Sequence, residues 1–200
     1  PVIQDATEIA IANGFKLSQV FEAVKQITAR VDTPVLVMTY WNPVIQYGVE
    51  RFAADLAAAG GAGLITPDLI PDEASDWLAI SDKYNLDRVF LSAPTSSEPR
   101  VQKATDLSRG FVYAVSTMGI TGAREELDTL ARKVVAGVRK ADPAQNTCVG
   151  IGISTADQVA EVNQYADGAI VGSAFVKAYA SGGIKGLEAK VSELASKLVG

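Results

Sequence analysis

The stretch Val149-Gly150-Ile151-Gly152-Ile153-Ser154, with Gly168-Ala169-Ile170-Val171-Gly172-Ser173 further along the chain, decides the fold. Each is an apolar run that ends in glycine and a hydroxyl residue, and each precedes a helix-forming stretch. Backbone N–H groups gather at such a helix N-terminus, and a glycine without Cβ lets an anion approach them closely. Two neighbouring strands that end this way can direct their amides to one point, so the pair predicts a phosphate-binding site. Either stretch alone is also explained as a glycine-containing turn between a strand and a helix.

The composition is that of one soluble globular domain, with 200 residues, 48% hydrophobic and 20% charged. A net charge of -5 argues against nucleic acid and against an anionic membrane as the main partner, although a locally positive site remains compatible with it. No run is long enough and apolar enough to predict a membrane span, and no signal peptide is visible. We therefore expect a cytoplasmic protein with no membrane partner.

Histidine is absent, which removes the commonest metal ligand and general base. Zinc sites and Ser-His-Asp catalysis are correspondingly disfavoured, and we expect no metal. The single cysteine, Cys148, cannot form an intrachain disulfide and lies in an apolar run. We interpret it as a small buried hydrophobic residue in a protein from a reducing compartment.

Apolar runs and helical periodicity alternate along the chain. After two helices at 1–13 and 17–30, strands are expected at 35–40, 64–66, 89–92 and 111–116, followed by the two stretches quoted above. The helices between and after them are expected at 49–59, 72–84 with Asp72 as its cap, 98–107, around 127–138, then after a Ser154/Asp157 capping box, and at 174–180 and 187–199. The result is a βα series with six strands.

Such a series forms either an open doubly wound sheet or a closed (β/α)8 barrel. The phosphate site on the last two strands favours the barrel, because barrels commonly bind phosphate there. The run Gly150-x-Gly152-x-x-Thr155 has some likeness to a dinucleotide-binding motif, but it lacks the third glycine and falls in the penultimate unit. Two helices precede the first strand, and the six expected strands are two fewer than the eight that close such a barrel.

Six motifs, in this order and spacing, together resemble the alpha subunit of tryptophan synthase, from Pro1 to Val199. They are Pro1-Val2-Ile3-Gln4, Met38-Thr39-Tyr40-Trp41-Asn42-Pro43, Pro67-Asp68-Leu69-Ile70-Pro71-Asp72-Glu73, Gly110-Phe111-Val112-Tyr113 with Ser116 to Gly122, Gly150-Ile151-Gly152-Ile153-Ser154 and Gly172-Ser173-Ala174. The resemblance implies a (β/α)8 TIM barrel that cleaves indole-3-glycerol phosphate to indole and glyceraldehyde 3-phosphate. It also implies a beta subunit that carries pyridoxal phosphate, in an alpha2beta2 assembly, and no cofactor in this chain.

The family's two catalytic carboxylates, a glutamate and an aspartate, correspond to positions upstream of Pro1. We therefore expect residues 1–200 to form a single, N-terminally incomplete barrel domain that lacks the first two strands and is inactive alone. Measurable indole release by this polypeptide, at a rate comparable with that of an intact chain, would contradict this expectation.

The resemblance also implies roles for particular residues. Tyr113 and Thr121 are expected to support catalysis. Substrate contacts are expected from Tyr40, Leu91, Tyr113, Thr121, Gly122, Ile151, Gly152, Gly172 and Ser173. The surface for the beta subunit is expected at Trp41, Asn42, Pro43, Asp68 and Pro71, with Trp41 as an exposed aromatic anchor. Asp68 is also a candidate acid, although a capping or interface role suits it better.

Two other functions stay open at this point. The first is a non-catalytic barrel that binds a phosphate ligand or regulates a partner, which the missing carboxylates favour. The second is a sugar-phosphate epimerase or isomerase of the same barrel type, which would need metal ligands or acids that the sequence does not offer.

Overall fold

The computed structural model describes residues 2–115, 124–150 and 152–198. Its helices are α1 (Val2–Ala12), α2 (Ser18–Thr28), α3 (Trp41–Tyr47), α4 (Val49–Ala58), the 3-10 turn η1 (Pro71–Glu73), α5 (Ser75–Lys83), α6 (Glu98–Leu107), α7 (Arg124–Ala141), α8 (Ala156–Val162) and α9 (Ser173–Ala195). Its strands are β1 (Leu36–Met38), β2 (Gly63–Ile65), β3 (Asp87–Val89), β4 (Leu91–Ser92), β5 (Val112–Val115), β6 (Thr147–Gly150) and β7 (Gly168–Ala169).

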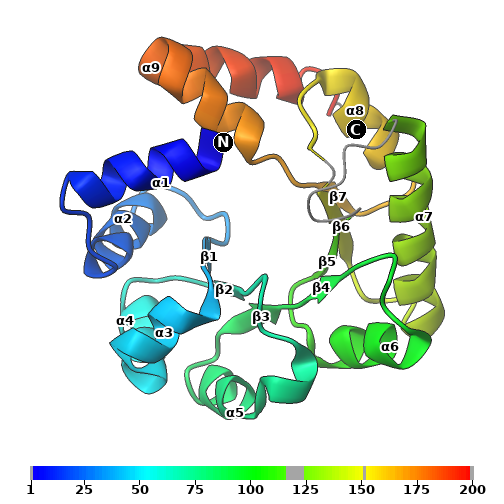
Figure 1. The fold of residues 1–200 in the computed structure, drawn as a ribbon, viewed down its shortest axis with the longest axis horizontal. Coiled ribbons are helices and arrows are strands. Elements are labelled where there is room, and N and C mark those ends of the chain that lie inside the picture. Colours follow the sequence, from blue (N-terminus) through cyan, green and yellow to red (C-terminus); the bar gives the residue numbers. More distant parts are fainter. Residues whose placement is uncertain (1, 116–123, 151, 199–200) are drawn as a thin grey trace.

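All strand pairs are parallel and follow the chain order, β1-β2-β3 in one sheet and β4-β5-β6-β7 in the other. Only Phe90 separates β3 from β4, and its carbonyl accepts a hydrogen bond from the N–H of Tyr113 at 3.0 Å. The two sheets therefore continue into one another, and the strand expected at 89–92 is present as two short pieces. Figure 1 shows the strands at the centre with the helices around them, as in part of a (β/α)8 barrel.

Burial along the strands alternates because one face lies under the helices and the other faces the centre of the array. In β5 and β6 the helix-facing residues are buried and the centre-facing residues are half-buried. On α7 the buried residues recur at a spacing of three to four, which is the period of one helix face, at Ala131, Val134, Val135 and Val138. Two apolar cores result, one around β1 to β3 with α2 to α5 and one around β5 and β6 with α7 to α9.

The outer ring of helices closes further than the strands do. Helices α1 and α9 lie side by side, although they are at opposite ends of the chain (Figure 1). Strands β1 and β7 do not pair with one another in the described part of the chain. The centre of the array is therefore open between these two strands, which leaves side chains such as Met38 exposed.

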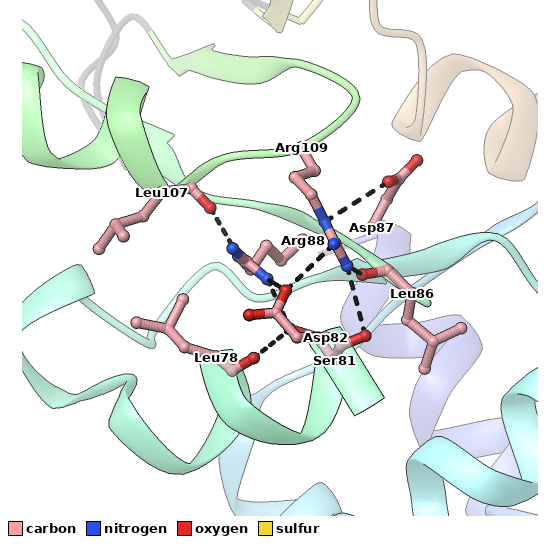
Figure 2. A network of polar contacts seen from close by, with 8 residues as sticks. All are labelled: Leu78, Ser81, Asp82, Leu86, Asp87, Arg88, Leu107 and Arg109. Atoms are coloured by element: carbon pink, nitrogen blue, oxygen red, sulfur yellow. Dashed lines mark hydrogen bonds and ion pairs between the residues drawn. The ribbon is translucent and has the colours of Figure 1, made fainter. Parts of the chain in front are cut away.

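At the amino end of β3, two arginines form a polar network (Figure 2). Arg88 donates to the carbonyl of Leu107 at 2.7 Å, to Ser81 Oγ at 2.9 Å and to Asp82 Oδ1 at 2.6 Å. Arg109 pairs with Asp82 at 3.1 Å and also donates to the carbonyl of Leu86. The network ties α5 and α6 to the strand end opposite the phosphate-binding corners, so we assign it to stability.

Three local expectations were wrong. Asp72 does not cap α5: it lies in η1 and pairs with Lys103, and α5 begins only at Ser75 because Ala74 leaves the helical conformation. Residues 41–47, where the sequence predicted no helix, form α3, whose start is held by the Asp68 carboxylate from the loop after β2. The capping box of α8 is formed by Thr155 and Gln158, not by Ser154 and Asp157.

No helix in the described ranges is long and apolar enough to cross a membrane.

Candidate active site

The two glycine corners lie at the same rim of the strand array. Strands β6 and β7 are parallel neighbours, with Cys148 opposite Gly168 and Val149 opposite Ala169. The N–H of Ile170 donates to the carbonyl of Val149 at 2.8 Å, so the pairing extends past the last strand residue. Because both strands run in the same direction, the turns that follow them emerge side by side at the carboxyl ends, as the sequence predicted.

The first corner begins at Gly152, which has a φ of 74° and is exposed. A side chain at this φ would be strained, although a Cβ there would meet no atom within 4 Å. The Oε1 atom of Gln158 accepts hydrogen bonds from the backbone N–H of Ser154 and of Thr155. The two amides next to α8 therefore already have a hydrogen-bond acceptor within the chain. The amides nearer Gly152 are the candidates for binding an anion.

The second corner is the start of α9, where Gly172 is the N-cap and no side chain caps the helix. The carbonyl of Gly172 accepts from the N–H of Phe175 and of Val176. The amides of Ser173 and Ala174 point out of the helix end, where no intrahelical acceptor exists. A Cβ on Gly172 would meet nothing within 4 Å, so an open space lies beside an amide-rich helix end. This combination suits a phosphate group.

The wall of the site is built from β4, β5 and β6. Leu91 lies opposite Tyr113, and Tyr113 lies opposite Cys148, so the three half-buried side chains share one face. Burial raises the pKa of the Tyr113 hydroxyl above its ordinary value of 10.0, so this group is neutral at physiological pH. Gly150 lies beside the Tyr113 ring and leaves room for it. The wall offers an apolar surface with one neutral hydroxyl, which suits a flat aromatic group.

Tyr40 lies at the same rim, two residues after the end of β1, and is 63% exposed. It belongs to the end of the array that carries β1 to β3, whereas Tyr113 belongs to β5. Three expected site residues, Thr121, Gly122 and Ile151, lie outside the described residues.

The expected partner surface lies on α3 and the loop after β2. Asp68 accepts the N–H of Trp41 with both carboxylate oxygens, at 2.9 and 3.1 Å, and so caps α3. Trp41 is half-buried, with its ring 6.1 Å from that of Trp77, so the exposed aromatic here is its neighbour Tyr40. Asn42 is exposed, and Pro43 and Pro71 are half-buried.

Sequence reasoning missed two residues of the site. Gln158 occupies the third position after the N-cap Thr155, and the pattern Thr-x-x-Gln before an apolar run was the signal that could have identified it. Gly150 was noted only as part of the strand, because nothing in the local sequence shows that a tyrosine from the preceding strand lies beside it. In the described ranges, no group of three or more His, Cys, Asp or Glu side chains is placed to hold a metal ion.

Comparison with known proteins is consistent with this geometry. A family model described as tryptophan synthase alpha chain matches residues 1–198. The tryptophan synthase alpha chain of Leifsonia xyli subsp. xyli is 63% identical over 194 residues, which are 97% of this chain and 74% of that protein. That of Mycobacterium avium is 50% identical over 98% of this chain and 72% of its own length.

Solved structures agree with the sequence comparison. A structure of Mycobacterium tuberculosis tryptophan synthase has a TM-score of 0.92 at 48% identity, over all of this chain and 76% of that chain. A tryptophan synthase complex from Pyrococcus furiosus has a TM-score of 0.85 at 30% identity, over 98% of this chain and 79% of that chain. Both the resemblance and the barrel-type α/β fold predicted from the sequence are confirmed. The chain belongs to the tryptophan synthase alpha chain family, lyases that cleave indole-3-glycerol phosphate to indole and glyceraldehyde 3-phosphate and work with a beta subunit.

Proposed function

We propose that this chain binds the phosphate of indole-3-glycerol phosphate between the two glycine corners, at the amides of Gly152, Gly172 and Ser173. The observation that carries the proposal is the open, amide-rich space at the adjacent ends of β6 and β7. Backbone amides and a helix N-terminus bind a phosphate without a cationic side chain, which suits a chain with a net charge of -5. The hydroxyl of Ser173 would add one more donor.

The indole ring would lie along the wall formed by Leu91 and Tyr113. Cleavage needs a proton delivered to the ring carbon and a proton removed from the side-chain hydroxyl. Tyr113 does not serve as the base in this proposal, because its raised pKa keeps its proton in place. We assign it the role of orienting the ring and a neighbouring polar group through its hydroxyl.

Four further contacts are proposed on the strength of the resemblance. Thr121 and Gly122 would close over the substrate, with Thr121 in the supporting catalytic role. Ile151 would add to the apolar wall, and Tyr40 would contact the substrate from the β1 end of the rim. Asp68 is not proposed as an acid, because both of its oxygens hold the N–H of Trp41.

The proposed surface for the beta subunit includes Trp41, Asn42, Pro43, Asp68 and Pro71. Its support is the exposed apolar area around these residues, where Tyr40, Ile45 and Ile70 are 63%, 50% and 43% exposed. In this proposal Tyr40 is the aromatic anchor and Asp68 shapes the surface by fixing α3. The proposed assembly is alpha2beta2, with pyridoxal phosphate on the beta subunit.

Calorimetric titration with glycerol 3-phosphate, with glycerol as the phosphate-free control, tests the phosphate site. Gly172→Val is the decisive variant, because the valine side chain would fill the open space beside the amides. We expect at least about a tenfold loss of affinity, since several amide contacts would be blocked, and thermal denaturation of the variant checks that it remains folded. Unchanged glycerol 3-phosphate binding by Gly172→Val would refute the assignment.

Indole release from indole-3-glycerol phosphate tests the catalytic half of the proposal, measured with the beta subunit present and in a chain that also carries the family's two catalytic carboxylates. Phosphate-ligand binding without any turnover under these conditions would favour a binding module over a lyase. Turnover that disappears in Gly172→Val and is regained at high substrate concentration would support the lyase with the phosphate site as assigned.

A further inference from the structure

Helix α9 takes part in both glycine corners, because it changes direction at Gly183. Gly183 has a φ of 60° and a ψ of -150°, which interrupts the helix. The first half begins at the Gly172 corner, and the second half runs back along α8 (Figure 1). There Leu194 is buried in the same apolar core as Val159 and Val162, which anchors the second half of α9.

Lys190, on the second half of α9, contacts the other corner. Its Nζ atom donates to the carbonyl oxygen of Ser154 at 3.3 Å and pairs with Glu193 Oε2 at 2.6 Å. The side chain is only 26% exposed, so its stem is packed and its position is restricted. Ser154 is two residues after Gly152, and its backbone N–H donates to Gln158 Oε1.

The Gly152 corner depends on such contacts for its shape. Gly152 is exposed, and a Cβ there would touch no neighbouring atom, so packing does not hold it in place. The next two residues hold Gly152 in its left-handed conformation. Ile153 is buried, and Ser154 forms hydrogen bonds with Gln158 and Lys190. Without the bond from Lys190, the Ser154 carbonyl would be fixed only through the backbone.

We infer that Lys190 is a positioning residue for phosphate binding: it ties the Gly152–Ser154 corner to the helix whose N-terminus forms the Gly172–Ser173 corner. The inference rests on the proposed function, since it concerns the same phosphate site. Because Glu193 offsets the charge of Lys190, the effect on phosphate arises from the position of the amides rather than from long-range attraction. A loss of affinity on substitution should therefore depend little on salt concentration.

The test compares three variants by titration with glycerol 3-phosphate and with indole, which lacks phosphate. Lys190→Met keeps an apolar stem but removes the donor, and Lys190→Arg restores a donor. The matched control is Lys197→Met, because Lys197 lies just past the same helix and pairs with Asp157 on α8 rather than with the corner.

For Lys190→Met we expect a threefold to tenfold loss of glycerol 3-phosphate affinity, about the effect of one net hydrogen bond, with indole binding unchanged. In turnover with the beta subunit, measured in a chain that also carries the family's two catalytic carboxylates, KM should rise and kcat should hold. Lys190→Arg should recover most of the affinity, and Lys197→Met should bind like the unaltered chain.

Two results would overturn the inference: unchanged glycerol 3-phosphate affinity in Lys190→Met, or an equal loss of indole and glycerol 3-phosphate binding, which would indicate general destabilisation. The variant Gly172→Val distinguishes failure of the inference about Lys190 from failure of the proposed phosphate site. If Gly172→Val abolishes phosphate binding and Lys190→Met does not weaken it, only the role of Lys190 fails. If neither variant changes the affinity for glycerol 3-phosphate, the phosphate site itself is wrongly assigned.

Discussion

The ring of Tyr113 on β5 lies beside the Cα of Gly150 on β6, so closely that an added Cβ at Gly150 would be 2.7 Å from the ring atom Cζ. The two strands are paired with Val115 opposite Gly150, so the ring leans across to the position diagonal to its own. Gly150 is therefore required by a side chain from another strand. Its φ is not the reason, because the residue is not among those with a positive φ.

Gly150→Ala should displace the Tyr113 ring from the wall of the site. Overpacking of this kind typically costs about 1–3 kcal/mol of the free energy of unfolding, and the moved ring should also weaken indole binding. Urea denaturation and titration with indole measure the two effects. The control is Gly137→Ala on α7, where a Cβ would be 3.6 Å from Val101 Cγ1, an ordinary contact.

Gly137→Ala should stabilise the chain by about 0.5–1 kcal/mol, since alanine is the better helix former. A Gly150→Ala variant as stable as the unaltered chain, with normal indole binding, would show that the ring moves aside freely. The glycine would then have no role in the site.

Arg88→Met should destabilise the fold strongly, because the Arg88 side chain is 11% exposed and bonds to Leu107, Ser81 and Asp82 (Figure 2). We expect a loss of about 2–4 kcal/mol at pH 7 by urea denaturation, since the buried Ser81 and the half-buried carbonyl of Leu107 lose their donor and Asp82 loses its ion pair. Lys83→Met is the control: it breaks the exposed Lys83–Glu50 pair and should cost less than about 1 kcal/mol.

The loss of unfolding free energy caused by Arg88→Met should become smaller at low pH. Hydrogen bonding and the charge of Arg88 hold the pKa of Asp82 below its ordinary value of 3.8. A lowered folded-state pKa contributes stability above pH 3.8 that is lost as the pH falls through the folded-state value. The stability difference between Arg88→Met and the unaltered chain should therefore narrow below pH 3.8. A constant difference down to pH 2 would mean that the Asp82 charge plays no part.

Asp68→Ala should loosen the start of α3, because the carboxylate accepts the N–H of Trp41 from a different loop. The expected cost is about 1 kcal/mol, as for loss of a helix cap, and Asp68→Asn should cost less because one oxygen acceptor remains. Trp41 and Trp77 are the two tryptophans of the chain, so their fluorescence reports the change directly.

Binding of the beta subunit should weaken in Asp68→Ala if the proposed partner surface is correct, since Tyr40 and Trp41 would lose their fixed placement. Glu73→Ala, an exposed carboxylate in η1, serves as the control for simple charge loss. Equal beta-subunit affinity in Asp68→Ala and Glu73→Ala would remove α3 from the proposed interface.

Cys148 should react slowly with iodoacetamide in the folded chain. Burial, and secondarily the Asp167 carboxylate, raise the pKa of its thiol from 9.0 to about 11. At pH 8 this lowers the thiolate fraction about 100-fold relative to the unfolded chain, and alkylation should slow accordingly. The same chain in denaturant is the control, because Cys148 is the only cysteine.

The raised pKa of Cys148 also predicts how stability varies at high pH. The folded chain keeps the proton that the unfolded chain loses above about pH 9, so the stabilising contribution is present below pH 9 and lost towards pH 11. Cys148→Ala should remove this part of the pH dependence.

Fast alkylation of the folded chain at pH 8 would show that the thiol is more accessible to water than the structure indicates.

Helices α4 and α6 lie almost where the sequence placed them, at Val49–Ala58 and Glu98–Leu107. Their apolar period and their ends are set by residues close together in the chain, such as the Pro at the start of α6. The order of the strands also followed from the sequence, because short βα repeats pair neighbours in parallel. The start of α3 did not, since its cap, Asp68, comes from the loop after β2.

The sequence by itself therefore determined the βα series, the family and the two glycine corners. Hydrophobic periodicity, glycine turns and helix caps depend on residues that are close together in the chain, so they can be recognised without the tertiary structure. Tertiary structure alone decided that Gly150 makes room for Tyr113, that Asp68 holds Trp41 and that Lys190 reaches Ser154. These partners are 27 to 37 residues apart in the chain. Such contacts exist only once helices and strands have packed, because packing fixes which side chains meet.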